Sequence, residues 1–202
     1  MITALALVFS CVLAQPVTNP VPGASASAPG VFRDEMDSPF LWGLPGSAND
    51  PFLSSDVPGV LTMTMPQVAA GYPHSYQWGA ATRTVVINTD AAPLLIARVS
   101  QVSDGAYAHL DVEMRDYAGV VVKSARSSTV QGAGFVSVNL REQFGTGLLR
   151  VTIRLIVGGA NSGAWVDYDY LRAVSIADFT TLQNAPVKKS VTPPVAKRKR
   201  RK

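Results

Sequence analysis

Four ring side chains alternate with other residues in one short segment: Tyr72, His74, Tyr76 and Trp78. In an extended segment, side chains spaced by two project from the same face. Pro73 cannot donate a ladder hydrogen bond, which favours a sheet edge or a loop. A row of such rings suits sugar recognition, because ring faces pack on the apolar face of a pyranose while OH and NH groups bond its hydroxyls. We expect Trp78 to pack in the core and the first two rings to be exposed.

A second row of polar side chains belongs to the stretch from Ala106 to Met114. Its members are Tyr107, His109, Asp111 and Glu113. Such a row can form the floor of a shallow groove that hydrogen-bonds hydroxyls, which makes Tyr107 and His109 candidate ligand contacts. The commoner arrangement is a solvated sheet face, and we expect that here.

Trp42 and Trp165 are two further candidate ligand contacts. Both lie beside glycine-rich segments, and β-sandwiches often place their binding residues on such loops. Packing against the end of the sandwich is the alternative for both side chains.

Few residues point to catalysis. The chain has no G-x-S-x-G, no H-E-x-x-H and no phosphate-binding glycine motif. Its only histidines, His74 and His109, are too few for a zinc site. The carboxylates Asp111, Glu113 and Asp116 are spaced in a way that resembles the catalytic strand of some retaining glucanases. A small glycoside hydrolase that uses these three acids is therefore an alternative function.

The elements that position these residues are strands. Apolar and polar residues alternate through the body, and Gly and Asp punctuate the alternation, which indicates an all-β fold, an antiparallel sandwich or barrel. The body shows no convincing helical period. The predicted strands are Val60–Met65, Arg83–Thr89, Leu94–Gln101, Ala106–Met114, Val120–Arg126, Val136–Leu140, Leu149–Val157 and Ala164–Ser175.

The basic charge of the chain is concentrated at one end. The 202 residues carry a formal net charge of +4, but the stretch 187–202 holds eight of the 18 basic residues and no acid. The rest of the chain has a net charge of −4, so we predict no specific nucleic-acid binding by the body. Lys188–Lys202 is a candidate tether to an anionic cell-surface polymer or lipid; a solubilising tail is the alternative.

The sequence divides into four parts. Residues 1–14 are predicted to be a signal peptide, 15–30 a Pro/Ala/Ser linker, 31–180 a β-sandwich and 181–202 a disordered basic tail. Lipidation of Cys11 is an alternative to cleavage after Ala14. No apolar run is long enough for a transmembrane helix. These features predict a secreted or cell-surface protein.

Both ends of the body carry motifs that point to one family. Phe32–Asp37, the Trp at position 42 and Gly59–Thr62 open the body, and Trp165–Arg172 closes it. This arrangement resembles secreted carbohydrate-binding modules of the galactose-binding-like superfamily. The resemblance implies an antiparallel jelly-roll β-sandwich. It also implies a structural calcium ion, whose candidate ligands are Glu35, Asp37, Asp167 and Asp169.

Together these features predict an exported, non-catalytic module that binds carbohydrate through aromatic rings. The glycoside hydrolase is one alternative. A structural or adhesion protein of an envelope, attached through its tail, is the other.

Overall fold

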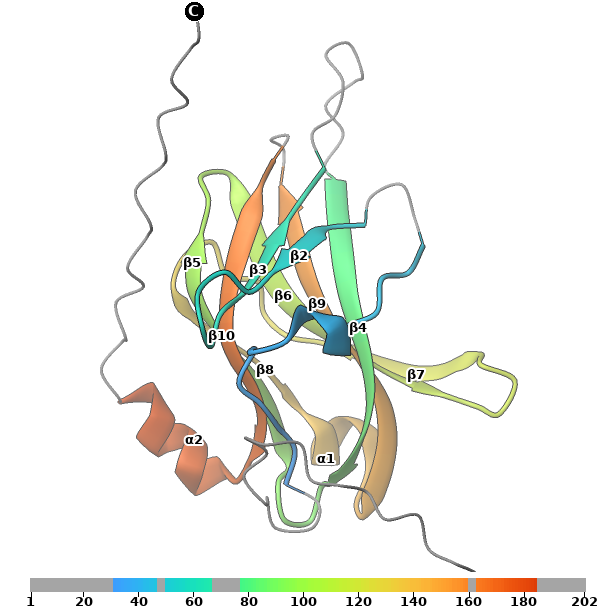
Figure 1. The fold of residues 1–202 in the computed structure, drawn as a ribbon. Helices are drawn as coiled ribbons and strands as arrows, with labels where there is room; N and C mark the ends of the chain where they lie inside the picture. Colours follow the sequence, from blue (N-terminus) through green and yellow to red (C-terminus); the bar gives the residue numbers. More distant parts are fainter. Residues whose placement is uncertain (1–30, 47–49, 67–76, 160–162, 185–202) are drawn as a thin grey trace, which may run out of the picture.

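The computed structural model describes residues 31–46, 50–66, 77–159 and 163–184. Strands dominate the described part and form two antiparallel sheets that face each other (Figure 1). The strands are β1 (Arg33–Asp34), β2 (Phe52–Ser54), β3 (Leu61–Thr64), β4 (Gln77–Asn88), β5 (Leu94–Val102), β6 (Ala106–Arg115), β7 (Val121–Arg126), β8 (Gly134–Asn139), β9 (Leu148–Gly159) and β10 (Trp165–Val174).

The strand order defines a jelly roll. The first sheet, called the β10 sheet, has the order β2-β3-β10-β5-β8, with β1 also paired to β10. The second, the β9 sheet, has the order β4-β9-β6-β7. Along the chain, the strands from β3 to β10 switch between the two sheets at each step except one, because β6 and β7 are neighbours in the β9 sheet. Eight strands that cross in this way form the double-sheet jelly roll, which confirms the predicted fold class.

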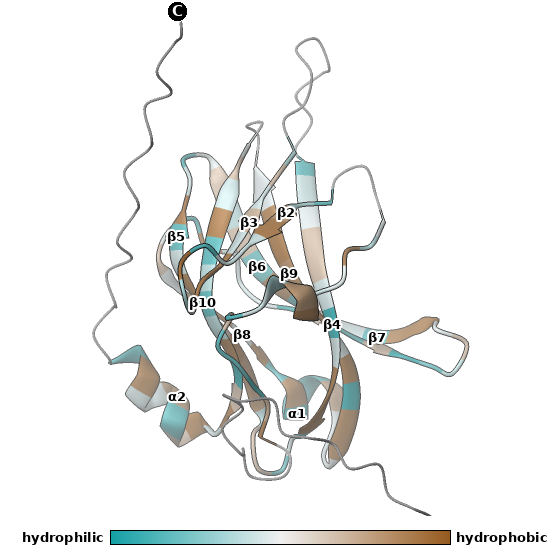
Figure 2. Cartoon of the chain, in the orientation of Figure 1, coloured by the Kyte–Doolittle hydropathy of each residue, from teal (hydrophilic) through white to brown (hydrophobic). Residues whose placement is uncertain are grey.

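The core lies between the sheets and follows the predicted alternation. On β6, Ala106, Ala108, Leu110 and Val112 are at most 1% exposed, and they belong to one apolar cluster with inward residues of β5, β9 and β10. The alternation of hydrophobic and hydrophilic residues is visible along the strands (Figure 2).

One buried tyrosine ties the two sheets together. Tyr168 on β10 is fully buried, and its hydroxyl donates a hydrogen bond of 2.8 Å to the carbonyl oxygen of Ile156 on β9. Burial raises the pKa of this phenol, so it stays a neutral donor.

The predicted strands are confirmed to within a few residues, except that β4 begins earlier, at Gln77. Short helical elements were not expected. They are the 3₁₀ turn η1 (Pro39–Leu41), α1 (Leu140–Phe144) and α2 (Ile176–Gln183).

Both α-helices begin at side-chain caps. Asn139 accepts a hydrogen bond from the backbone N–H of Glu142, and Ser175 accepts one from that of Asp178. The five residues of α1 are too few for a helical period. No residue of α2 is fully buried, although its Phe179 ring packs edge-on against Phe135 on β8, and α2 crosses the predicted boundary at residue 180.

The predicted signal peptide and linker lie outside the described residues, as does the tail from residue 185 onward. In the described part of the chain, no helix is both long and apolar enough to cross a membrane.

Candidate functional site

On the outward face of the β9 sheet, one row consists of a glycine with one aromatic ring on each side. Gly158 on β9 pairs with Trp78 on β4 and with Tyr107 on β6. A Cβ atom at Gly158 would lie only 2.2 Å from the Cζ atom of Tyr107, so the Tyr107 ring occupies the space above the glycine. Trp78 is 49% exposed. The two rings therefore mark one end of this face.

In the next rows along this face, charged side chains stand where the first row has rings. The register sets Arg154 on β9 beside Asp111 on β6, and Asp111 beside Arg126 on β7. One row further along, Glu113 pairs with Thr152 and with Ser124.

Ion pairs hold the two carboxylates of this face. Arg126 donates two hydrogen bonds to Asp111, from Nε to Oδ1 at 2.7 Å and from Nη2 to Oδ2 at 3.1 Å. Arg154 Nη1 donates to Glu113 Oε1 at 2.7 Å, and Arg115 Nε donates to the other oxygen at 3.1 Å. Asp111 is 8% exposed and Glu113 is 7% exposed. The expected solvated face is therefore wrong, because arginines from neighbouring strands cover these acids.

These contacts keep both acids ionised. Burial by itself raises the pKa of Asp111, but contacts with His109 and Arg126 outweigh it and lower the pKa to about 2. Burial also raises the pKa of Glu113, and the bonds from Arg154 and Arg115 lower it below its usual range. Neither group can therefore serve as a proton donor near neutral pH.

His109 lies between the ring row and the charged rows. Its ring stacks on Tyr107 with 5.8 Å between centroids and 6° between planes, and the residue is 5% exposed. Its Nε2 lies 3.5 Å from Asp111 Oδ1, too far for a well-formed hydrogen bond. Neither imidazole nitrogen has a hydrogen-bond partner among the described residues. A buried imidazole without a hydrogen bond costs free energy, so this residue calls for a structural or functional explanation.

Two adjoining hollows follow these rows, and we call them together the outer groove. The first, of about 170 Å³, is lined by Trp78, Tyr107, His109, Asp111, Arg126, Arg154 and Ile156. The second, of about 440 Å³, shares Asp111, Arg126 and Arg154 with the first and adds Glu113, Ser124 and Ala125. The Arg154 guanidinium lies 5.3 Å from the centre of the Trp78 ring, a cation–π contact that orients both side chains.

The outer groove brings together three of the predicted ligand contacts, namely Trp78, Tyr107 and His109. The expectation that Trp78 packs in the core is wrong, because this side chain stands on the outward face beside Arg154. The predicted contacts Tyr72, His74 and Tyr76 lie outside the described residues.

The other two tryptophans lie away from the outer groove. Trp42 is 5% exposed and belongs to the core, as the packing alternative for this side chain describes, and its role as a ligand contact stays a prediction. Paired backbone bonds of 2.8 Å between Gly43 and Thr82 fix this segment against β4. Trp165 begins β10 in the opposite sheet, where it pairs with Thr64.

The four predicted calcium ligands do not gather into a site. Both oxygens of Glu35 accept hydrogen bonds from Arg172, at 2.9 and 2.6 Å, and Asp169 lies 3.5 Å from Arg98 Nε. Asp167 accepts a bond of 2.7 Å from the Thr62 hydroxyl, and burial raises its pKa. Among all described residues, Asp37 included, no group of three or more His, Cys, Asp or Glu could hold a metal ion. The positions of these carboxylates do not fit a calcium ion, which takes six to eight oxygen ligands. Calcium binding itself stays a prediction.

The sequence prediction missed the arginines that complete the groove, Arg126 and Arg154. Arg154 lies on the polar side of an alternating strand, a signal visible in the sequence. Its pairing with Glu113, 41 residues earlier, depends on strand register and was not predictable.

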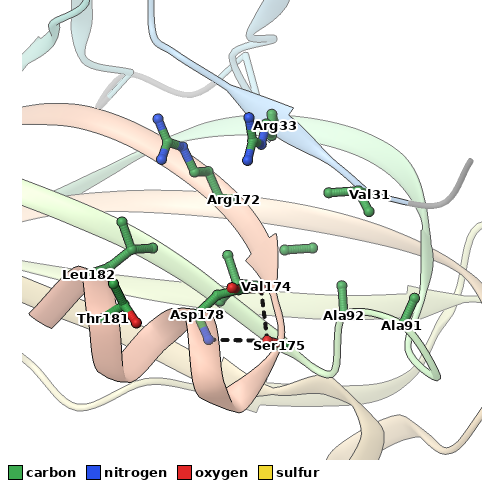
Figure 3. A pocket seen from close by; sticks show the side chains of 11 residues that line it. Val31, Arg33, Ala91, Ala92, Arg172, Val174, Ser175, Asp178, Thr181 and Leu182 are labelled. Carbon is green, nitrogen blue, oxygen red and sulfur yellow. Dashed lines mark hydrogen bonds between the residues drawn. The ribbon is translucent and has the colours of Figure 1, made fainter. Parts of the chain in front are cut away.

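A third hollow, of about 220 Å³, lies between α2, β1 and the end of β10 (Figure 3). Ser175 caps α2 by accepting a hydrogen bond from the backbone N–H of Asp178, and its hydroxyl donates to the Asp178 carboxylate. Arg172 donates to Glu35. Much of the remaining lining is apolar, from Val31, Ala91, Ala92, Val174 and Leu182. Arg33 and Thr181 are its further polar residues, so the lining of this hollow is mixed.

No family of known proteins matches the chain. No curated protein matches it either. Solved structures of similar shape include the family 11 carbohydrate-binding module from Clostridium thermocellum, in complex with a β-1,3-1,4-mixed-linked tetrasaccharide. It is 9% identical with a TM-score of 0.47, and the match covers 74% of this chain and 98% of the module.

A family 22 carbohydrate-binding module from Clostridium thermocellum is 12% identical with a TM-score of 0.42, covering 74% of this chain and 98% of the module. Tailspike protein 4 of bacteriophage CBA120 is 10% identical with a TM-score of 0.41. That match covers 70% of this chain, which spans only 20% of the tailspike domain. Likenesses of this size do not assign a function.

Proposed function

We propose that this protein is an exported, non-catalytic module that binds carbohydrate in the outer groove. One observation carries the proposal: Trp78 and Tyr107 stand on either side of Gly158, next to a buried imidazole that makes no hydrogen bond among the described residues. Ring faces match the apolar faces of sugars, and fixed polar groups beside them select hydroxyl or acidic substituents.

The fixed geometry of the groove supports binding at low ordering cost. Asp111, Glu113 and their arginines are held by ion pairs before any ligand arrives. Side chains that are already ordered lose little entropy on binding. The groove is small and open, so we expect micromolar to millimolar dissociation constants, about −8 to −4 kcal/mol.

The hydrolase alternative lacks a general acid in this groove. A retaining glycosidase needs one carboxyl group that stays protonated near its working pH. Here Asp111 and Glu113 have lowered pKa values. Asp116 caps the β6–β7 turn, where it accepts bonds of 2.9 and 2.8 Å from the backbone N–H groups of Ala118 and Val120.

Export and surface attachment form the remaining part of the proposal. The apolar N-terminal stretch supports secretion, and the cationic run Lys197–Lys202 supports an electrostatic tether to an anionic polymer or lipid. Cell fractionation tests both, through the position of the N-terminus and the effect of deleting Lys188–Lys202 on surface retention.

A glycan array with the Trp78→Ala variant tests the binding site. Trp165→Ala is the matched control, since it also replaces a tryptophan by alanine, but in the opposite sheet. We expect the wild type and the Trp165 variant to bind the same glycans and the Trp78 variant to lose them. Equal binding by the two variants, or loss only in the Trp165 variant, would place the site elsewhere.

A further inference from the structure

The geometry points to an acidic sugar as the ligand: the outer groove binds a saccharide unit that carries a carboxylate or a sulfate group. This inference rests on the proposed function and specifies its ligand. Its basis is the balance of hydrogen-bond donors and acceptors in the groove that remain available to a ligand.

The carboxylates of the groove are already paired with arginines. Both carboxylate oxygens of Asp111 accept bonds from Arg126. The two oxygens of Glu113 accept from Arg154 and from Arg115. A carboxylate has about four acceptor sites, so these arginines use about half of the acceptor capacity of Asp111.

The donors, in contrast, exceed the acceptors available to them. A guanidinium carries five N–H groups. Within the described part of the chain, Arg154 uses only Nη1 for a bond to a side chain, and Arg126 uses Nε and Nη2. His109 Nε2 lies 3.5 Å from Asp111 Oδ1, and neither imidazole nitrogen makes a hydrogen bond among the described residues.

This imbalance distinguishes acidic sugars from neutral ones. Each hydroxyl of a neutral sugar brings a proton that needs an acceptor, and the carboxylates of the groove are already partly used by arginines. A carboxylate or sulfate group brings only acceptors. An arginine fork matches such a group in geometry, and charge-assisted bonds are about twice as strong as neutral ones.

The local charge agrees with this assignment. The groove and its contacts comprise Arg115, Arg126 and Arg154 against Asp111 and Glu113, so one positive charge is in excess. This excess lies on a body whose formal charge, over residues 1–186, is −4. An anionic ligand is therefore attracted to this face rather than to the body as a whole.

The test compares trigalacturonate with its methyl ester, which has the same shape without the charge. Binding of each to the full chain is measured by titration calorimetry, with a sulfated trisaccharide as the third ligand. Short ligands limit the contribution of the basic tail, and the tail is identical in every variant. Arg126→Gln removes a guanidinium group from the groove, and Arg126→Lys removes it but keeps the positive charge. Arg150→Gln is the control, because Arg150 lies on β9 and faces outward but lines neither hollow.

We expect the free acid or the sulfated sugar to bind at least about tenfold more tightly than the ester. Arg126→Gln should abolish that preference, Arg126→Lys should restore part of it, and the Arg150 variant should keep it. A preference for the sulfated sugar alone would identify sulfate as the anionic group. Equal binding of acid and ester, or equal losses in the Arg126 and Arg150 variants, would overturn the acidic-sugar assignment while the proposed function stands. If no saccharide binds, both fail.

Discussion

Adding a single methyl group at Gly158 should displace the Tyr107 ring from the outer groove. The new Cβ atom would lie 2.2 Å from Cζ, 2.3 Å from Oη and 2.7 Å from Cε1 of Tyr107. Contacts this short cannot persist, so the ring must swing toward solvent and lose its stacking on His109. Overpacking of this kind typically costs about 1–3 kcal/mol.

The sign of the effect should reverse once the ring is removed. In a Tyr107→Ala background the space above Gly158 is free, and alanine is favoured over glycine in a strand by about 0.5–1 kcal/mol. Gly158→Ala should therefore destabilise the wild type and stabilise the Tyr107 variant. The resulting coupling energy is at least about 1.5 kcal/mol.

Thermal unfolding of the four proteins in this cycle provides the assay. For a chain of this size, 1 kcal/mol corresponds to about 2–4 °C in Tm. Gly134→Ala serves as the control, because its Cβ would meet only the Val130 side chain, at an ordinary distance of 3.7 Å. Equal Tm shifts for Gly158→Ala with and without the ring would refute the packing of Tyr107 described here.

Three further predictions concern stability. Because the pKa of Asp111 is lowered from 3.8 to about 2, its ion pair stabilises the fold above about pH 4, and this contribution is lost as the pH falls toward 2. Asp111→Asn should therefore flatten the fall of Tm over that range, and an unchanged slope would argue against the ion pair. Tyr168→Phe removes the hydroxyl bonded to Ile156 and should cost about 1 kcal/mol by urea unfolding, whereas no loss would show that the bond between the sheets contributes nothing. Since Glu35 and Asp169 already have arginine partners, chelation with EGTA should leave Tm unchanged. A fall in Tm would instead support the calcium prediction.

The sandwich could be predicted because its signal is local. On β6 the apolar side chains of Ala108, Leu110 and Val112 alternate with polar ones, and every second residue faces the core as expected. The helices could not be predicted in the same way. α1 is too short for a period, and α2 packs no buried side chain against the body.

The site was only partly predictable because it depends on contacts across strands. The sequence indicates that Tyr107, His109 and Asp111 share one face of a strand. It does not indicate that Arg126 and Arg154 come alongside and bury the acids. The same limit explains the expected burial of Trp78, since its exposure follows from its position in the register of the sheet rather than from its neighbours in sequence.

The most direct test of the binding surface is chemical-shift mapping by NMR during titration with trigalacturonate and its methyl ester. If the outer groove binds sugar, the indole N–H of Trp78, the imidazole of His109 and the guanidinium of Arg154 will shift together, while Trp165 stays unperturbed. Shifts centred on Trp165 and the β10 sheet, or none with either ligand, would contradict the account.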